Sequence, residues 1–327
     1  MRKLFLLLVS LVAFAVGAAQ AETYNFTLAG ASPGGLWTSL GVGVDGAVKA
    51  AYSGSNITYQ TSGGGIANIT LLEQQKVQMG LAHDAELKIA ADGGAPFNRP
   101  VKDVRMLANM YDWAPMFAIM TKAFADKYGI KTFDDIAVKK PPMRLVLNKR
   151  GNIANNVGEQ MLKAIGVSLD DIKKWGGQVT LAASGEQTDL MKDRRADLII
   201  NSLFVRHGSL LELEQAVDVV HLPLSAKVID QVTKEAGIKP FIIPAGSYKL
   251  QTNPVPTVTL SAGVVVNAAM DEKTAYNLTK ALVEHIGKIK EVHKSMQALT
   301  PQLMASHTVI PFHPGATRYY KEAGLLK

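Results

Sequence analysis

Three strand-like runs, separated by polar loops and helical stripes, lie between Tyr24 and Ala82. Tyr24–Ala29 alternates apolar and polar residues, as half-buried strands do, and stops at the glycine-rich segment Gly30–Gly35. Ile57–Gln60 stops at a second glycine-rich loop, and Val77–Ala82 is a third short strand. The first helical stripe places five apolar residues on one face, namely Leu36, Leu40, Val44, Ala47 and Val48. This alternation predicts an α/β fold with parallel strands joined by right-handed crossovers.

The same alternation continues through the rest of the chain. We expect further strands at Met116–Met120, Arg144–Asn148, Asp197–Ile200, Val258–Leu260 and Val264–Asn267. Capping boxes at Thr132–Asp135 and Ser168–Asp171 predict helix starts, which accounts for their paired aspartates without catalysis. Further helices are expected after Asn152, after Ser184 and over residues 275–289.

The length of 327 residues suggests two domains or one large one. Breaks in the pattern near Tyr111–Pro115 and Ser261–Gly263 indicate that the chain leaves a first lobe and later returns to it. We therefore predict a first lobe made of residues 22–111 plus 263–327 and a second lobe made of residues 112–262. The two crossing segments would carry any bend between the lobes.

The N-terminus has the features of an export signal. Arg2 and Lys3 precede the apolar run Leu4–Val16, and the small residues of Ala19-Gln20-Ala21 fit the signal peptidase pattern. The run is too short for a permanent membrane anchor, which needs ~20 apolar residues. We predict a signal peptide over residues 1–21. A lipid anchor would need a cysteine after the signal, and the sequence has none, so the expected compartment is the periplasm.

Composition excludes several functions. The absence of cysteine rules out disulfide frameworks, Cys-ligated zinc, iron–sulfur clusters and thiol nucleophiles. The net charge of +7 includes no dense basic block, and Arg194-Arg195 and Lys139-Lys140 have no interleaved aromatic residues, so nucleic acid is not an expected partner. The histidines lack metal-site spacing, and the glycine loops match no nucleotide motif. We expect neither a metal nor a cofactor.

The two glycine-rich loops are the strongest candidates for a binding site. Each lies between a strand end and a helix start, where unpaired backbone N–H groups attract a carboxylate, phosphate or sulfate. The alternative is that both are simply tight turns. Two successive loops at one sheet edge favour a small anionic ligand. The candidate residues from these loops are Ser32, Gly34, Gly35, Trp37, Ser62, Gly63, Gly64 and Gly65.

His83 and Asp84 follow the third strand and lie at the same expected edge. They are candidate ligand-binding residues, although a helix cap at Asp84 beside an exposed His83 explains them equally well. A periplasmic hydrolase or transferase that uses His83 with Asp84 is the rival function. The sequence has no G-x-S-x-G elbow, and binding without turnover is the simpler interpretation.

The C-terminal string Ile310-Pro311-Phe312-His313-Pro314-Gly315-Ala316, followed by Tyr319-Tyr320-Lys321-Glu322, resembles the closing signature of the TAXI family. TAXI proteins are the extracytoplasmic substrate-binding proteins of TRAP transporters. The Gly30–Gly35 loop, Thr61–Gly65 with Asn68, and Ile243–Tyr248 follow that family's order. The resemblance covers essentially the whole chain after the signal.

This resemblance implies a two-lobed, type II-like periplasmic-binding-protein fold with the ligand cleft between the lobes. It implies capture of a glutamate-like amino acid, C4–C6 dicarboxylate or 2-oxo acid for an ion-gradient-driven TRAP membrane permease. We expect a monomer. A sensory binding protein is the alternative of the same class.

Two segments depart from the family pattern. Where glycine and small hydroxyl residues are usual, the chain has Arg150, Asn152 and Asn155, and Ser202 and Arg206 occupy the next expected ligand loop. The two arginines either clamp a second carboxylate of the ligand or only steer anions from the rim. We include all five residues among the candidate ligand contacts.

Overall fold

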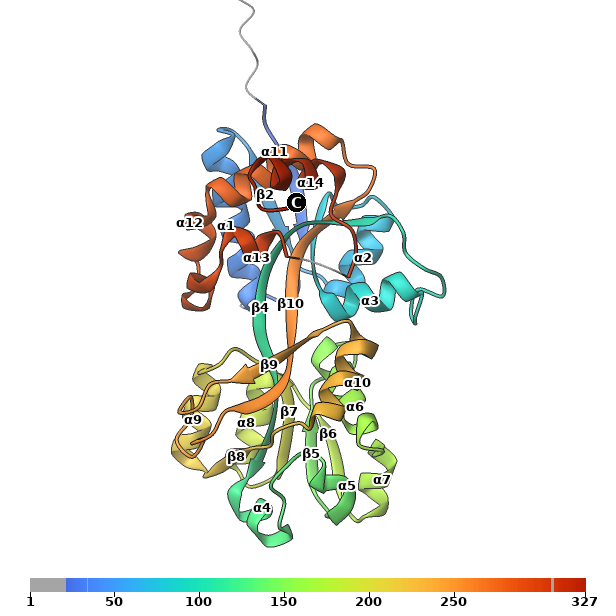
Figure 1. Ribbon diagram of the computed structural model, residues 1–327, viewed down its shortest axis with the longest axis vertical. Coiled ribbons are helices and arrows are strands. Elements are labelled where there is room, and N and C mark those ends of the chain that lie inside the picture. Colours follow the sequence, from blue (N-terminus) through green and yellow to red (C-terminus); the bar gives the residue numbers. More distant parts are fainter. Residues whose placement is uncertain (1–21, 34, 307–308) are drawn as a thin grey trace, which may run out of the picture.

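The computed structural model describes residues 22–33, 35–306 and 309–327, which form two lobes stacked along the long axis (Figure 1). The first lobe, drawn at the top, contains β1 (Asn25–Ala29), β2 (Asn56–Gln60) and β3 (Met79–His83). The second lobe contains β5 (Arg144–Leu147), β6 (Gln178–Leu181) and β7 (Leu198–Ser202). Residues 1–21 and Gly34 lie outside the described residues, so the signal peptide and that candidate contact stay predictions.

The predicted parallel pairing is confirmed in both lobes. β1 pairs in parallel with β2 and β3, and β5 pairs in parallel with β6 and β7. The strand order is β2-β1-β3-β10-β4-β7-β5-β6, with β4 (Val104–Thr121) and β10 (Val255–Asn267) in the middle. β8 (Val219–His221) pairs with β4, and β9 (Lys239–Ile243) pairs with β10. The fold is mixed α/β, as predicted.

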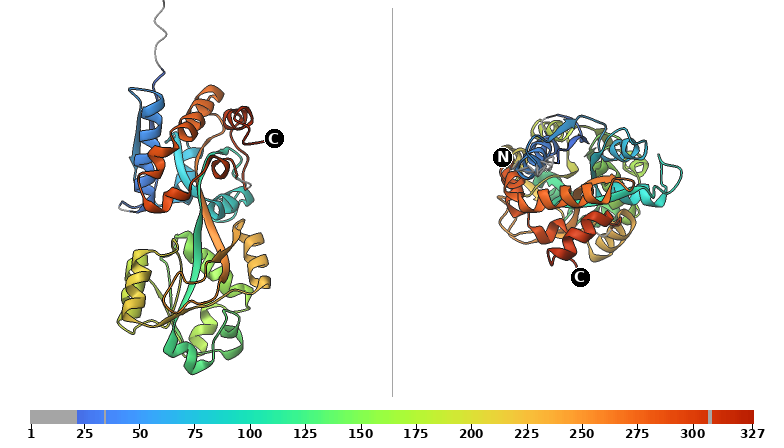
Figure 2. Two further views of the ribbon diagram at one scale, coloured as in Figure 1. Left: turned by 60° about the vertical axis from the view of Figure 1, so that its left-hand side comes forward. Right: turned by 90° about the horizontal axis from the view of Figure 1, so that it is seen from above.

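Helices cover the sheet in each lobe (Figures 1 and 2). The first lobe carries α1 (Leu36–Ala51), α2 (Gly65–Glu73), α3 (Asp84–Asp92), α11 (Glu272–Glu284), α12 (Ile286–Lys290), the 3-10 helix η1 (Lys294–Ala298), α13 (Pro301–Met304) and α14 (Pro314–Glu322). The second lobe carries α4 (Lys122–Tyr128), α5 (Asp135–Lys139), α6 (Ile153–Ala164), α7 (Leu169–Lys174), α8 (Ser184–Lys192), α9 (Gly208–Ala216) and α10 (Ala226–Ala236). Among the described residues, no helix has the length and apolar character needed to cross a membrane.

β4 and β10 run antiparallel from one lobe into the other (Figures 1 and 2). The prediction of two separate strands at Val258–Leu260 and Val264–Asn267 was wrong, because β10 is continuous. β4 is also longer than predicted, since it begins at Val104 and passes through Pro115 without a break. The register between the two strands shifts at Leu260/Ala262, Ala262/Gly263 and Val264/Val265. Two of the three irregularities therefore coincide with the predicted crossing segment, although the strand does not end there.

Two helix predictions need correction. The expected helix over residues 275–289 ends at Glu284, and α12 starts a new helix after His285. At Thr132–Asp135 the N-cap is Asp134, and the Asp135 carboxylate accepts hydrogen bonds from the amides of Lys131 and Thr132. The Ser168 capping box is confirmed, with Asp171 as its partner.

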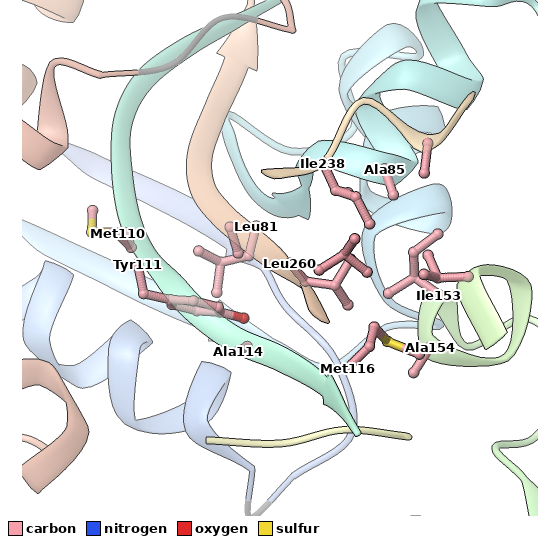
Figure 3. Close-up of a cluster of buried hydrophobic side chains, with 14 of the residues drawn as sticks. Leu81, Ala85, Met110, Tyr111, Ala114, Met116, Ile153, Ala154, Ile238 and Leu260 are labelled. Carbon is pink, nitrogen blue, oxygen red and sulfur yellow. The ribbon is translucent and has the colours of Figure 1, made fainter. Parts of the chain in front are cut away.

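An apolar cluster packs the lobes together beside the crossing strands (Figure 3). Leu81 and Ala85 from the first lobe face Ile153 on α6 of the second lobe, and Leu260 of β10 lies between them. Ile153 is 5% exposed and the other three are 2% exposed or less. This cluster closes the inner end of the space between the lobes.

The C-terminal string that carries the family resemblance has a packing role in the first lobe. The His313 side chain caps α14 by accepting from the Gly315 amide, and the His313 amide donates to Met106 of β4. A Cβ atom at Gly315 would fall 2.1 Å from the Glu272 carbonyl oxygen, so α14 and α11 meet through this glycine. None of these contacts reaches the space between the lobes.

Candidate functional site

A cleft between the lobes brings most of the predicted site residues together. It comprises two adjoining cavities of about 490 and 230 Å³ that share His83, Asn148, Asn152, Ile153 and Ser184. The first-lobe wall of the larger cavity consists of Ala31, Ser32, Trp37, Ser62, Gly63, Gly64, His83 and Glu86. The second-lobe wall consists of Asn148, Lys149, Arg150, Gly151, Asn152, Ile153, Ala183 and Ser184. Three larger hollows, of about 540, 640 and 700 Å³, are lined only by residues of the second lobe.

The second glycine loop is held in place by its own side chains. The Ser62 hydroxyl lies 2.7 Å from the Gly30 carbonyl oxygen, and the Gly64 amide donates back to Ser62 Oγ over 3.0 Å. Gly64 has a φ of 96°, which favours glycine, and it forms the N-cap of α2. Within the described chain, no protein group accepts from the amides of Gly65, Ile66 and Ala67. The loop therefore leaves the first turn of α2 available as a donor surface.

A directed hydrogen-bond chain lines the first-lobe wall. Trp37 Nε1 donates to the Tyr111 hydroxyl over 3.0 Å, and that hydroxyl lies 3.2 Å from Nε2 of His83. The other ring nitrogen of His83, Nδ1, lies 3.1 Å from Oε2 of Glu86. A carboxylate only accepts, so Nδ1 carries a hydrogen, and the Tyr111 hydroxyl is free to donate to Nε2. Burial raises the pKa of Tyr111, which keeps that hydroxyl protonated.

His83 and Asp84 have separate environments. The His83 ring is half-buried in the cleft, tilted over Trp37 at a centroid distance of 4.7 Å, so the alternative of an exposed His83 was wrong. The Asp84 carboxylate is buried and accepts from the amides of Ala85 and Ser261. Burial raises its pKa from 3.8 to about 7, while the nearby His83 opposes that rise. Because Glu86 is the hydrogen-bond partner of His83, the two residues do not form the dyad that the hydrolase alternative requires.

The second-lobe wall carries a polar triad at the carboxyl ends of its strands. Ser184 Oγ accepts from Asn148 Nδ2 over 3.2 Å and from Asn201 Nδ2 over 3.0 Å. Its own hydroxyl hydrogen is therefore left to donate to a ligand. Asn148 Nδ2 also donates to Asn201 Oδ1 over 3.1 Å, which fixes the orientation of both amides.

The departures from the family pattern have different roles in the structure. Asn152 lines the cleft and caps α6 by accepting from the Ala154 amide, whereas Asn155 is buried and donates to the Asn148 carbonyl oxygen. Ser202 lines the smaller cavity, and its hydroxyl donates to the Ala114 carbonyl oxygen of β4. Arg150 lines the larger cavity.

Arg206 lies elsewhere, away from both cleft cavities. Its amide donates to the Tyr248 hydroxyl, and Nη1 donates to the Ser247 carbonyl oxygen over 3.2 Å. It lines a separate hollow together with these two residues. Of the glycines, Gly63 and Gly64 line the cleft, whereas Gly35 and Gly65 mark the starts of α1 and α2 and line neither cavity.

Several cleft residues were not predicted from the sequence. Asn148, Ser184 and Asn201 were not singled out, although each lies at or just after the carboxyl end of a second-lobe strand. That position is the signal that could have found them, because ligands of open α/β sheets bind at this edge. Glu86 and Tyr111 had no comparable signal, since one lies in the first turn of a helix and the other in a crossing strand. Over the described ranges, no three His, Asp or Glu side chains are grouped to hold a metal ion.

Comparison with known proteins gives a family and a fold. The chain matches the NMT1-like family over residues 28–324. It is similar to the structure of MatC from Rhodopseudomonas palustris with bound malate, at 13% identity and a TM-score of 0.55, covering 92% of this chain and 97% of that one. It is similar to the periplasmic binding protein BugD at 15% identity and a TM-score of 0.51, covering 93% and 98%.

A third structure has the same fold. A TctC solute binding protein from Polaromonas matches at 11% identity and a TM-score of 0.52, covering 83% of this chain and 87% of that one. At these identities the likeness shows the fold alone, which is that of periplasmic solute-binding proteins.

Proposed function

The chain belongs to the NMT1-like family, and from that premise we propose that it is the solute-binding component of a TAXI-type TRAP transporter. It captures a small organic anion, either an acidic amino acid or a C4–C6 dicarboxylate or 2-oxo acid. It delivers this ligand to a membrane permease driven by an ion gradient. The protein works as a monomer in the periplasm, to which residues 1–21 direct it.

The observation that carries this proposal is the convergence of helix N-termini from both lobes on one cleft. Gly63 and Gly64 precede α2, Asn152 caps α6, and Ser184 opens α8, and all four line the same cavity. Helix N-termini and their unpaired amides attract carboxylates. Lys149 and Arg150 add positive charge to the second-lobe wall. A cleft with this lining suits a small acid better than an apolar or cationic molecule.

The crossing strands give the cleft a means of closing. We assign residues 22–111 plus 263–327 to the first lobe and 112–262 to the second, with the bend at Tyr111–Pro115 and Val258–Gly263. Two of the three register shifts of β10 against β4 fall in the second of these segments. A ligand shifts the balance toward a closed form only if it contacts both lobes, because only then does it bind the closed form more tightly.

We revise the second-lobe contacts. Arg206 is left out, because its guanidinium faces the Ser247 carbonyl oxygen outside the cleft. Asn155 and Ser202 are left out as well, because the side chain of each donates to a backbone carbonyl oxygen. The second-lobe contacts are instead Arg150, Asn152 and the Ser184 hydroxyl. Trp37 forms part of the first-lobe wall, where its ring would cover the apolar part of a ligand.

A thermal-shift screen tests the proposal. The purified protein is heated with C4–C6 dicarboxylates, 2-oxo acids and acidic amino acids, one at a time. A ligand at about 100 times its dissociation constant adds about 2.7 kcal/mol of stability, enough to raise the melting temperature by several degrees. No shift with any of these acids would contradict the proposal. Turnover of esters or amides by the same preparation would favour the hydrolase alternative instead.

A further inference from the structure

A carboxylate of the protein itself occupies the first-lobe end of the cleft. Glu86 lines the larger cavity, although its side chain is only 4% exposed. Its Oε2 accepts from the His83 amide over 2.8 Å and faces His83 Nδ1. The other oxygen, Oε1, receives no hydrogen bond from any residue in the described part of the chain. A carboxylate offers about four lone-pair positions, so Glu86 retains accepting capacity toward a ligand.

This carboxylate lies against the start of α2. A Cβ atom at Gly65 would fall 1.7 Å from Glu86 Oε2, so the glycine leaves the space that Glu86 occupies. The first turn of α2 is where the sequence predicts a ligand carboxylate. A second carboxylate placed there would lie beside Glu86, and two like charges in a half-buried site repel each other strongly.

The neighbouring imidazole uses only one oxygen of Glu86. Trp37 Nε1 donates to the Tyr111 hydroxyl, which lies 3.2 Å from Nε2 of His83. A carboxylate only accepts, so Nδ1 of His83 directs its hydrogen to Glu86 Oε2. Oε1 stays available as an acceptor at the first-lobe wall.

The second-lobe wall, opposite Glu86, carries positive charge and hydrogen-bond donors. Lys149 and Arg150 lie on the second-lobe side of the larger cavity, together with the starts of α6 and α8. The hydroxyl hydrogen of Ser184 is available on the same side. The second-lobe wall is therefore a donor wall with positive charge, whereas the first-lobe wall places the Glu86 acceptor beside the amides at the start of α2.

We infer that Glu86 determines ligand specificity by accepting a hydrogen bond from a protonated amine, so that the ligand is a zwitterionic amino acid. Its carboxylate faces the donor wall at Arg150, Asn152 and Ser184. This inference rests on the proposed function and narrows it, because it disfavours dicarboxylates and 2-oxo acids that have no amine. It also reverses the ligand orientation that the glycine loops alone would suggest, in which the ligand carboxylate faces the first lobe.

Three acids with the same five-carbon skeleton test the inference. L-Glutamate carries the amine, 2-oxoglutarate replaces it with a ketone, and glutarate lacks it altogether. Calorimetric titration of the wild-type protein should give an affinity for L-glutamate at least about tenfold higher than for the other two, as expected for a charge-assisted hydrogen bond. Equal or tighter binding of 2-oxoglutarate or glutarate would overturn the inference and leave the proposed function standing. Failure of all three to bind would count against both.

Glu86→Gln isolates the role of the charge, because the amide oxygen still accepts from the His83 amide. We expect this variant to lose the preference for L-glutamate, through weaker glutamate binding and unchanged or tighter glutarate binding. The matched control is Asp92→Asn on the same helix, whose carboxylate is 56% exposed and pairs with Lys88. The control should keep the wild-type preference. A preference that survives in Glu86→Gln would overturn the role of Glu86, and the wild-type comparison decides the ligand class even if that variant does not fold.

Discussion

The Tyr111 hydroxyl lies 3.2 Å from Nε2 of His83, and this contact joins a crossing strand to the wall of the cleft. Tyr111 belongs to β4, which runs through both lobes, whereas His83 ends β3 of the first lobe. The same hydroxyl accepts from Trp37 Nε1. A ligand that contacts His83 or Trp37 therefore contacts a residue that is hydrogen-bonded to β4, the strand that connects the lobes.

Tyr111→Phe should destabilise the protein. The substitution leaves Trp37 Nε1 and His83 Nε2 without their partner, and a buried polar group left unsatisfied costs about 1–3 kcal/mol. Urea denaturation measures the loss of unfolding free energy. Tyr128→Phe is the control, because no residue of the described chain bonds the Tyr128 hydroxyl, and it should change stability by less than about 0.5 kcal/mol. Equal effects of the two variants would show that the Tyr111 contact contributes nothing.

Gly65→Ala should also be destabilising, because the added methyl group would fall on Oε2 of Glu86. Moving a buried carboxylate and its partners costs about 1–3 kcal/mol, by analogy with overpacked cores. The control is Gly185→Ala near the start of α8, where a Cβ atom meets nothing within 4 Å. Alanine should be neutral or stabilising there, since it favours the helix. Thermal unfolding of both variants gives the comparison, and an unchanged melting temperature for Gly65→Ala would contradict the packing described.

Asp84 should make stability fall as the pH rises. Burial raises its pKa from 3.8 to about 7 in the folded protein, so the folded state holds a proton that the unfolded state has lost. The stabilisation is complete below pH 3.8 and is lost as the pH rises to about 7, with a slope of up to about −1.4 kcal/mol per pH unit.

Asp84→Asn tests this titration, because the amide oxygen can still accept from the amides of Ala85 and Ser261. The difference in unfolding free energy between variant and wild type should grow in favour of the variant from pH 4 to pH 7 and then level off. Asp92→Asn, exposed on the same helix, should follow the wild type throughout. A constant difference between Asp84→Asn and wild type would show that Asp84 does not titrate in this range.

Ser184→Ala should weaken binding without unfolding the second lobe. The substitution removes the hydroxyl hydrogen offered to the ligand and the oxygen shared by Asn148 and Asn201. We expect about a tenfold loss of affinity for the acid found in the thermal screen, from the loss of a hydrogen bond to a charged group. Ser53→Ala, at an exposed site after α1, should bind like wild type. Unchanged affinity in Ser184→Ala would remove the triad from the site.

Local sequence patterns predicted the short strands and helices that bury only one face. α1 follows its predicted stripe because Leu40, Val44, Ala47 and Val48 are all fully buried on one face. The crossing strands were divided wrongly because a strand passing between lobes has no single buried face. Pro115 and Ser261 resemble breaks in sequence, whereas in the structure Pro115 pairs with Thr259 and Ser261 lies inside β10 at a shift in register.

The sequence predicted the loops that form the site, but it did not predict which charged side chains turn into the cleft. Ser62, Gly64 and Asn152 reach the cleft because strand ends and helix starts are visible as local patterns. Glu86 lines the cleft and Arg206 does not, and the sequence indicated neither outcome for the same physical reason. Whether a side chain turns into the cleft or away from it depends on tertiary packing, such as the fit of Glu86 against Gly65, and sequence spacing does not encode that contact.

Hydrogen exchange with and without ligand tests most directly whether one small acid binds between the lobes. Mass spectrometry follows the amides of peptides covering residues 62–68, 149–155 and 183–187, using the acid found in the thermal screen. Saturating ligand should slow exchange in all three peptides, which come from both lobes. Protection confined to one lobe, or to residues 156–171 around the separate surface hollow, would contradict it.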